Sequence, residues 1–454
     1  MCIIAAIHRQ GKPMSEYNWP FIHGRGMHIS RADGIYLYDR AGEPIIDAAG
    51  GAIVANIGHG RQRVVDAVSR ATAETSYVVP TWTTPGREAM LEQLADWLPA
   101  GMTRVHGTSG GTEANEAALK IALHYQQAIG AHSKTEIIGR TISYHGTSLS
   151  TASLSGHPAR KRGLEAALPN FHHVETPYPL RCDLGTHGHD CGHFYADMLR
   201  DAIEQLGPEH VAAFVAEPIT GSSGGAIVPP DGYWQEVRAI CDEFGVLLVL
   251  DEVMTGFGRT GKDFGYQHWD ITPDIIVGGK GMAGGYAPLG GVFAKEDIGL
   301  AIADAGYPVM FNTFGAHPAA CAASAEVLKI MREEDLVARA ATQGEYLSAR
   351  LQDAFSNHPN VAEVRGRGLL SAIEVVVDRE SLERFPLQAQ LTQKIVAHGL
   401  KRGVFFYAGG TGDVRDIVCM GPPFVVEETD IDTIVSVLLD SVDAAVSDAT
   451  KSVH

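Results

Sequence analysis

The stretch PDIIVGGKGMAGGYAPLGG spans residues 273–291 and holds a short apolar run, a single lysine and several glycines. Short apolar runs bounded by turn-forming residues are typical of strands that are buried on both faces of a parallel sheet. Two more such runs, at 211–219 and 246–253, lie on either side of a segment with helical spacing at 231–245. This alternation of strands and helices predicts an α/β protein.

The rest of the chain extends this pattern. Short alternating strands with Asp-Gly and Ala-Gly turns predict a small meander over residues 30–48. We predict a large domain at 61–325 and a smaller domain at 326–454, to which the N-terminal segment 1–60 contributes. Further helices and strands are predicted at 62–75, 86–98, 112–129 and 318–355, and at 134–141 and 361–377.

The composition narrows the class of protein. The chain has 454 residues, 45% of them hydrophobic, which is enough for two or three domains with real cores. The formal net charge of −18 argues against nucleic acid or anionic lipid as the main partner. No window approaches the ~18 continuous apolar residues of a membrane span, and residues 1–13 do not resemble a signal peptide. Six cysteines suit a reducing cytoplasm better than a disulfide scaffold.

Lys280 stands where the predicted strand within 273–280 ends. A lysine at the end of a buried strand is partly desolvated, which lowers its pKa and frees the amine as a nucleophile. Glycines on both sides let a bulky ligand approach the backbone closely. These features fit a lysine that forms a Schiff base, and a structural lysine that reaches the surface beside glycine turns fits them as well.

Two carboxylates are predicted at the same edge of the sheet. Glu217 and Asp251 each follow a strand, and in open α/β sheets ligands collect at the carboxyl ends of the strands. A buried carboxylate needs a cationic or hydrogen-bonding partner, and a pyridinium nitrogen is one such partner. A charge pair at ~4 Å is worth about 4 kcal/mol at an effective dielectric of about 20, enough to keep a weakly basic ring nitrogen protonated. A helix-capping role for Asp251 is the simpler alternative.

Residues 106–120, HGTSGGTEANEAALK, lead from small residues straight into a helix. Backbone N–H groups at the helix start and the Thr112 hydroxyl form a site for an anion. An ordinary glycine-rich turn with a Ser/Thr cap explains one glycine there, but explains the run at 109–112 less well. Tyr144 follows another predicted strand, where its ring has room to stack on a flat ligand, although an isolated tyrosine more often belongs to the core.

Together these features describe one ligand that is flat, aromatic and phosphorylated, with a ring nitrogen and an aldehyde: pyridoxal 5′-phosphate (PLP). The chain resembles the class III (ω-amino acid type) aminotransferases, which are PLP enzymes of fold type I. The resemblance implies a large domain with a mainly parallel seven-stranded sheet and a smaller α+β domain. It extends over nearly the whole chain, through GHG near 58 and PPFVVEETDID near 422. Its most specific motifs, in the family's order from about 107 to 322, are SGGTEANEAALK, YHGTSLS, AEPITGSSGG, DEVMTGFGRTGK, PDIIVGGKGMAGGYAPLGG and NTFGAHPAACAA.

The resemblance implies a role for each matching residue. Lys280 would hold the cofactor as a Schiff base and later move a proton, and Asp251 would pair with the pyridine nitrogen. Thr313 would reach the phosphate from a partner subunit, which implies a homodimer, or a tetramer built from two dimers. The other implied cofactor contacts are Gly110, Gly111, Thr112, Tyr144, His145, Glu217 and Val253.

Three positions depart from the family's pattern. Met254 stands where many members carry a glutamine near the cofactor's phenolic oxygen. Ser222 and Cys419 stand where members that use glutamate and 2-oxoglutarate carry a glutamate–arginine pair. The absence of both partners favours pyruvate as the amino acceptor, with an amine or ω-amino acid as the donor.

Three residues are candidates for contact with the substrate. Ile53 and Trp82 are placed, by position, to form pocket walls beside Tyr144, which suggests room for an apolar portion of the donor. Arg415 is a candidate for binding a carboxylate, although a solvated loop arginine explains it at least as well.

Two further motifs suggest other ligands. GFGRTG at 256–261 matches the dinucleotide fingerprint, but it neither follows a strand directly nor opens a convincing helix. The segment 181–193 carries Cys182, His187, His189, Cys191 and His193, which are possible zinc ligands. The cysteine spacing is not that of a zinc site, so we interpret the segment as one exposed polar loop and predict no metal.

The sequence thus predicts a cytoplasmic PLP-dependent aminotransferase with a ping-pong mechanism, acting on small amines and keto acids, with no nucleic acid or membrane as partner. Other reactions of the same cofactor stay open: decarboxylating transamination, aminomutase and epimerase. A protein of this fold that only binds would lack Lys280 or Asp251, and both are present. An NAD oxidoreductase is a further alternative.

Overall fold

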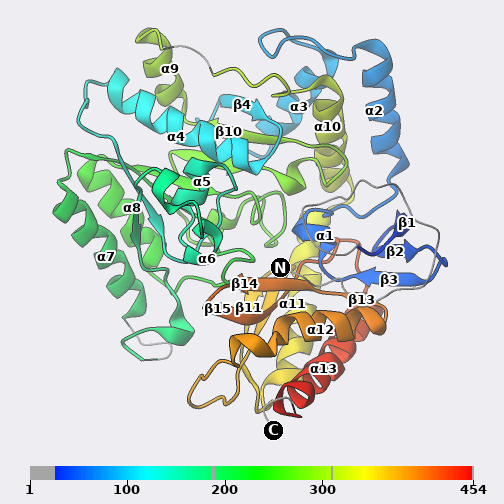
Figure 1. Ribbon diagram of the computed structural model, residues 1–454. Coiled ribbons are helices and arrows are strands. Elements are labelled where there is room, and N and C mark those ends of the chain that lie inside the picture. The colour runs from blue at the N-terminus through cyan, green and yellow to red at the C-terminus, as the bar shows by residue number, and fades with distance from the viewer. Residues whose placement is uncertain (1–25, 186–189, 308–309, 452–454) are drawn as a thin grey trace.

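Seven strands form the central sheet of the molecule (Figure 1). The computed structural model describes residues 26–185, 190–307 and 310–451. The strand order is β4-β10-β9-β8-β7-β5-β6, and neighbouring strands are parallel except that β10 is antiparallel to both of its neighbours. The predicted mainly parallel α/β sheet is confirmed. Its strands are β4 (Arg104–Thr108), β5 (Glu136–Arg140), β6 (His172–Val174), β7 (Val211–Ala216), β8 (Leu247–Asp251), β9 (Ile275–Gly278) and β10 (Gly290–Ala294).

The central strands are apolar throughout because both faces of the sheet are covered. Every residue of β7, β8 and β9 is buried. Successive side chains of a strand point to opposite faces, and so Val249 and Leu250 belong to different core clusters. The helices that surround the sheet are α2 (Gln62–Glu74), α3 (Pro85–Ala95), α4 (Gly111–Ala128), α5 (Leu149–Leu154), α6 (Pro158–Lys161), α7 (Cys191–Leu206), α8 (Tyr233–Phe244), α9 (Glu296–Asp304) and α10 (Pro318–Glu333).

Two four-stranded sheets form the smaller part of the molecule, in the orders β1-β2-β3-β13 and β11-β12-β15-β14. The predicted meander is present as β1, β2 and β3, and β3 pairs in parallel with β13. The elements of this part are β1 (Ile29–Asp33), β2 (Tyr36–Asp39), β3 (Pro44–Asp47), α1 (Gly50–Ile53), α11 (Leu336–Phe355), β11 (Val361–Arg367), β12 (Leu370–Val375), α12 (Leu391–Lys401), β13 (Val404–Phe405), β14 (Tyr407–Thr411), β15 (Val414–Met420) and α13 (Glu428–Lys451).

The helical stretch predicted at 318–355 is two helices. The first, α10, ends at Glu333, and Asp335 adopts a left-handed backbone with φ of 50° before α11 begins. The apolar periodicity does not reveal this break, because both helices bury a face and the residues between them are charged.

The segment 181–193 is not one exposed loop. Cys182 and Cys191 are buried in the core, and Cys191 begins α7. His193 Nδ1 lies 2.7 Å from a Glu236 carboxylate oxygen. His187 and His189 lie outside the described residues. Within the described ranges, no group of three or more His, Cys, Asp or Glu side chains is arranged to hold a metal ion, and no helix is long and apolar enough to cross a membrane.

Candidate active site

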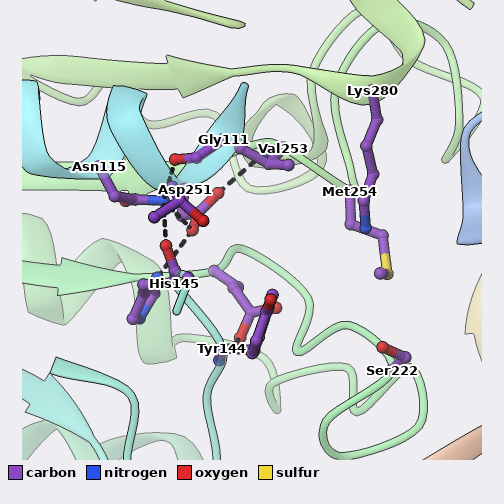
Figure 2. Close-up of a pocket in the computed structure, with 12 residues that line it drawn as sticks. Gly111, Asn115, Tyr144, His145, Ser222, Asp251, Val253, Met254 and Lys280 are labelled. Atoms are coloured by element: carbon purple, nitrogen blue, oxygen red, sulfur yellow. Dashed lines mark hydrogen bonds and ion pairs between the residues drawn. The ribbon is translucent and has the colours of Figure 1, made fainter. Parts of the chain in front are cut away.

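The carboxyl ends of β7, β8 and β9 converge on one pocket of about 180 Å³ (Figure 2). Glu217 follows β7, Asp251 is the last residue of β8, and Lys280 lies two residues beyond β9. Because these strands are parallel neighbours, their ends meet at the same edge of the sheet. The lining residues are Gly111, Thr112, Asn115, Tyr144, His145, Gly146, Glu217, Ser222, Asp251, Val253, Met254 and Lys280.

Lys280 begins a single turn of 3₁₀ helix, Lys280–Met282, and its amine extends into the pocket beside Met254 (Figure 2). Its φ of 43° is in the left-handed region, which few non-glycine residues adopt. Gly281 is required next to it, because a Cβ there would come within 2.8 Å of Asn56 Nδ2. Burial lowers the pKa of Lys280 to about 8, although the charges of Asp251 and Glu217 act in the opposite direction. The amine is therefore partly neutral, and hence nucleophilic, near neutral pH.

Asp251 is buried and held by three donors. Its Oδ2 accepts from Asn115 Nδ2 at 2.9 Å and lies 2.7 Å from His145 Nδ1, and its Oδ1 accepts from the backbone N–H of Val253 at 3.0 Å. A carboxylate has about four lone-pair positions, so one position remains for a ligand. Sequence reasoning missed Asn115, although the residue stands inside one of the motifs quoted for the resemblance.

Glu217 is the second buried carboxylate. One oxygen accepts from the backbone N–H of Gly221 at 2.9 Å, and the other accepts from that of Tyr144 at 3.2 Å. Burial raises the pKa of Glu217, while His145 and Arg140 oppose the shift. Glu217 thereby ties the Tyr144 backbone to the pocket floor.

The N-terminus of α4 faces the same pocket. Gly111 and Thr112 line it, whereas Gly110 does not, although Gly110 precedes the helix directly. A Cβ on Gly111 would lie 2.9 Å from Val253 Cγ1, so only glycine fits at this contact. The N–H groups of the first turn of any α-helix have no intrahelical acceptor. The anion site expected at the start of α4 stays a prediction.

Besides Gly110, four predicted site residues do not line the pocket in this chain. Trp82 is 66% exposed, Thr313 is also exposed, and Ile53 is buried against Gly421. The Arg415 guanidinium donates to the Phe385 carbonyl oxygen at 2.9 and 3.1 Å, outside the pocket.

The residues that depart from the family's pattern differ in whether they line the pocket. Ser222 and Met254 line the pocket, whereas Cys419 is buried in β15 with no lining position. The dinucleotide-like segment at 256–261 opens no helix, because only a 3₁₀ turn follows at Gly265–His268. Its Arg259 instead donates to the carbonyl oxygens of Leu369 and Pro422 in the smaller part of the molecule.

Comparisons with known proteins place the chain among the aminotransferases. Its sequence matches the family Aminotransferase class-III over residues 23–442. A putrescine–pyruvate aminotransferase of Pseudomonas aeruginosa is 34% identical over 92% of this chain and 91% of that protein. A diaminobutyrate–2-oxoglutarate transaminase of Halomonas elongata is 34% identical over 92% of this chain and 90% of that protein. The structure of an ω-transaminase from Pseudomonas jessenii matches with a TM-score of 0.87, 33% identity and 93% coverage of both chains.

Fold and site together define a PLP enzyme of fold type I. The chain belongs to the class III aminotransferase family, and it catalyses the transfer of an amino group from an amine to a keto acid.

The pocket fits the cofactor of this family. It offers one half-buried amine, one carboxylate with an unused lone-pair position and the N–H groups of the first turn of α4. When bound, PLP supplies an electron sink that stabilises negative charge on the substrate carbon next to the nitrogen.

Proposed function

We propose that this aminotransferase moves an amino group from an amine or ω-amino acid to pyruvate by a ping-pong mechanism. The convergence of Lys280, Asp251 and Glu217 on one pocket carries the proposal. The choice of pyruvate rests on Ser222 and Cys419, which leave no glutamate–arginine pair at these two positions. The names of the two relatives differ in their acceptors and do not decide this point.

The proposed roles follow the geometry. Lys280 attaches the cofactor, and its amine, with a pKa of about 8, is placed to take and return a proton at the substrate carbon. Asp251 holds the ring nitrogen protonated, oriented by Asn115 and His145. When PLP is bound, Val253 and Tyr144 would pack against its ring, and Gly110, Gly111 and Thr112 would hold its phosphate. Glu217 keeps Tyr144 in place.

We also propose a homodimer in the cytoplasm. Trp82, Phe311 and Phe314 are 66%, 59% and 61% exposed, which is unusual for large apolar side chains that lie near one another. Arg87 links their two segments, because its guanidinium donates to the carbonyl oxygens of Val79 and Ala316 at 2.9 and 2.6 Å. A partner subunit covering this surface would bring its own Thr313 toward the pocket.

The absorbance of the purified protein between 300 and 500 nm tests the proposed function. We expect a yellow band that one donor amine bleaches and that pyruvate restores, whereas 2-oxoglutarate does not. Restoration by 2-oxoglutarate alone would contradict the proposed acceptor. A band that no amine in a broad panel bleaches would contradict transamination, and the absence of a band after addition of PLP would contradict the role of Lys280.

A further inference from the structure

One arginine stands at the rim of the pocket without a carboxylate partner. Arg160 is an exposed residue of α6, and its guanidinium carbon lies 4.7 Å from the ring centroid of Tyr144, which lines the pocket. Its Nε donates to Thr411 Oγ1 at 3.2 Å, at the end of β14. α6 and β14 come from distant parts of the sequence and meet here (Figure 1).

Arg160 has donors to spare. Within the described part of the chain it forms no ion pair, and the Thr411 contact is its one side-chain hydrogen bond. A guanidinium carries five N–H donors in a planar fork, so at least one edge faces solvent or ligand. Arg415, by contrast, donates two hydrogen bonds to the Phe385 carbonyl oxygen.

The rim around Arg160 is fixed to the pocket on two sides. The backbone N–H of Gly410 in β14 donates to the carbonyl oxygen of Ser222, a lining residue, at 2.7 Å. Stacking on the Tyr144 ring orients the guanidinium on the other side. A planar fork held in this way presents a preformed site for a carboxylate.

We propose that Arg160 binds the carboxylate of the substrate, and so selects keto acids or ω-amino acids over partners that lack the group. This assignment rests on the proposed function, because it deepens the substrate class of the same pocket. Two sources supply the carboxylate, the keto acid acceptor and the ω-amino acid donor, and the experiment separates them.

The test compares Arg160→Gln with Arg162→Gln, which removes the same charge from an exposed neighbour. We expect Arg160→Gln to lower kcat/KM for pyruvate about tenfold or more, mainly through KM, because a charge-assisted pair is lost. The value for a carboxylate-free aldehyde acceptor such as butanal should stay unchanged. If the donor is the source, kcat/KM for β-alanine falls and that for propylamine does not.

Arg160→Lys should retain part of the discrimination, since it keeps the charge and loses the fork. Equal losses with the carboxylate and carboxylate-free partners, or no loss with either, would overturn the assignment. Calorimetric binding of propanoate to the cofactor-loaded protein gives a readout that needs no turnover: Arg160→Gln should weaken it and Arg162→Gln should not. An enzyme without transaminase activity that still binds propanoate through Arg160 would refute the proposed function alone, and unchanged propanoate binding in Arg160→Gln would refute this inference alone.

Discussion

At the scale of single residues, the pocket gathers three ionisable side chains, two of them buried and one half-buried. Lys280, Asp251 and Glu217 share it, and Lys280 also adopts a left-handed backbone. Strained or desolvated groups persist only where the surrounding structure holds them, and they gather at functional sites. These residues therefore lower the free energy of unfolding, and they do so where the protein needs reactive groups.

The depressed pKa of Lys280 predicts how stability depends on pH. Its folded value of about 8 lies below the ordinary 10.5, so between these values the unfolded chain binds more protons and the free energy of unfolding rises with pH. Without cofactor, Lys280→Met should be more stable than wild type at pH 7. Urea unfolding should show a free energy of unfolding that is higher by at most about 3 kcal/mol. The difference should vanish near pH 10.5. Lys262→Met, at an exposed lysine, should change nothing; the same pH profile in both variants would contradict the prediction.

Asp251→Asn removes the buried charge while keeping the shape of the side chain. A charge pair of about 4 kcal/mol corresponds to about a thousandfold in rate, so kcat should fall by about that factor. The cofactor should still bind, because Lys280 is intact. Steady-state kinetics and the visible absorbance of the variant check both points, with the exposed Asp413→Asn as the control. A kcat within a few-fold of wild type would exclude the proposed pairing with the ring nitrogen.

At the scale of elements, the start of α4 depends on contact between the helix and the turn after β8. Gly111 touches the Val253 side chain, while a Cβ on Gly110 would meet no atom within 4 Å. The two adjacent glycines thus serve different needs. Gly111 is required for packing, whereas the space beside Gly110 is open.

Gly111→Ala should therefore destabilise the cofactor-free protein by about 1–3 kcal/mol, as expected for overpacking. Gly110→Ala should leave the stability unchanged or raise it slightly, because alanine restricts the unfolded chain. Urea unfolding of the two variants side by side measures this difference. Equal midpoints would show that Val253 yields without strain.

Features that follow from local patterns, such as buried strands, could be predicted from the sequence. Features that depend on contacts between distant segments could not. Buried strands and their carboxyl ends were visible as apolar runs, which is why Glu217, Asp251 and Lys280 could be predicted to lie together. Arg160 carries no such signal, because its partners Tyr144 and Thr411 come from other elements. The sequence could not show that the Arg415 side chain contacts the Phe385 carbonyl oxygen, because position near a motif says nothing about the direction of a side chain.

At the scale of the whole molecule, exposed aromatic residues mark the proposed subunit interface. Phe314→Asp should shift the dimer toward monomer in light scattering and lower activity in parallel, since a buried charge without a partner is costly. Leu387 is similarly exposed, at 63%, in the smaller part of the molecule. Leu387→Asp should leave assembly unchanged, and a dimer that tolerates Phe314→Asp would contradict the proposed surface.

Mixed dimers test whether Thr313 acts across subunits. Lys280→Ala should be inactive, and Thr313→Ala should bind PLP more weakly. A hybrid dimer contains one subunit of each variant. If each site takes Lys280 from one subunit and Thr313 from the other, one site of the hybrid has both native residues and the other site has neither. The PLP affinity of the site with Lys280 should then return to the wild-type value. A weakened affinity in the hybrid would place Thr313 in its own subunit's site.

The pairing of β3 with β13 has a consequence for synthesis on the ribosome. The first strands emerge early, yet their sheet cannot be completed until residues 404–405 have left the exit tunnel. The apolar side chains of Ile45 and Ile46 are buried in the folded protein, but their sheet is incomplete until nearly the entire chain has been translated. A nascent chain that stalls before β13 would thus expose the unpaired, aggregation-prone edge of β3. We expect chaperones to bind the nascent chain first at its N-terminal strands.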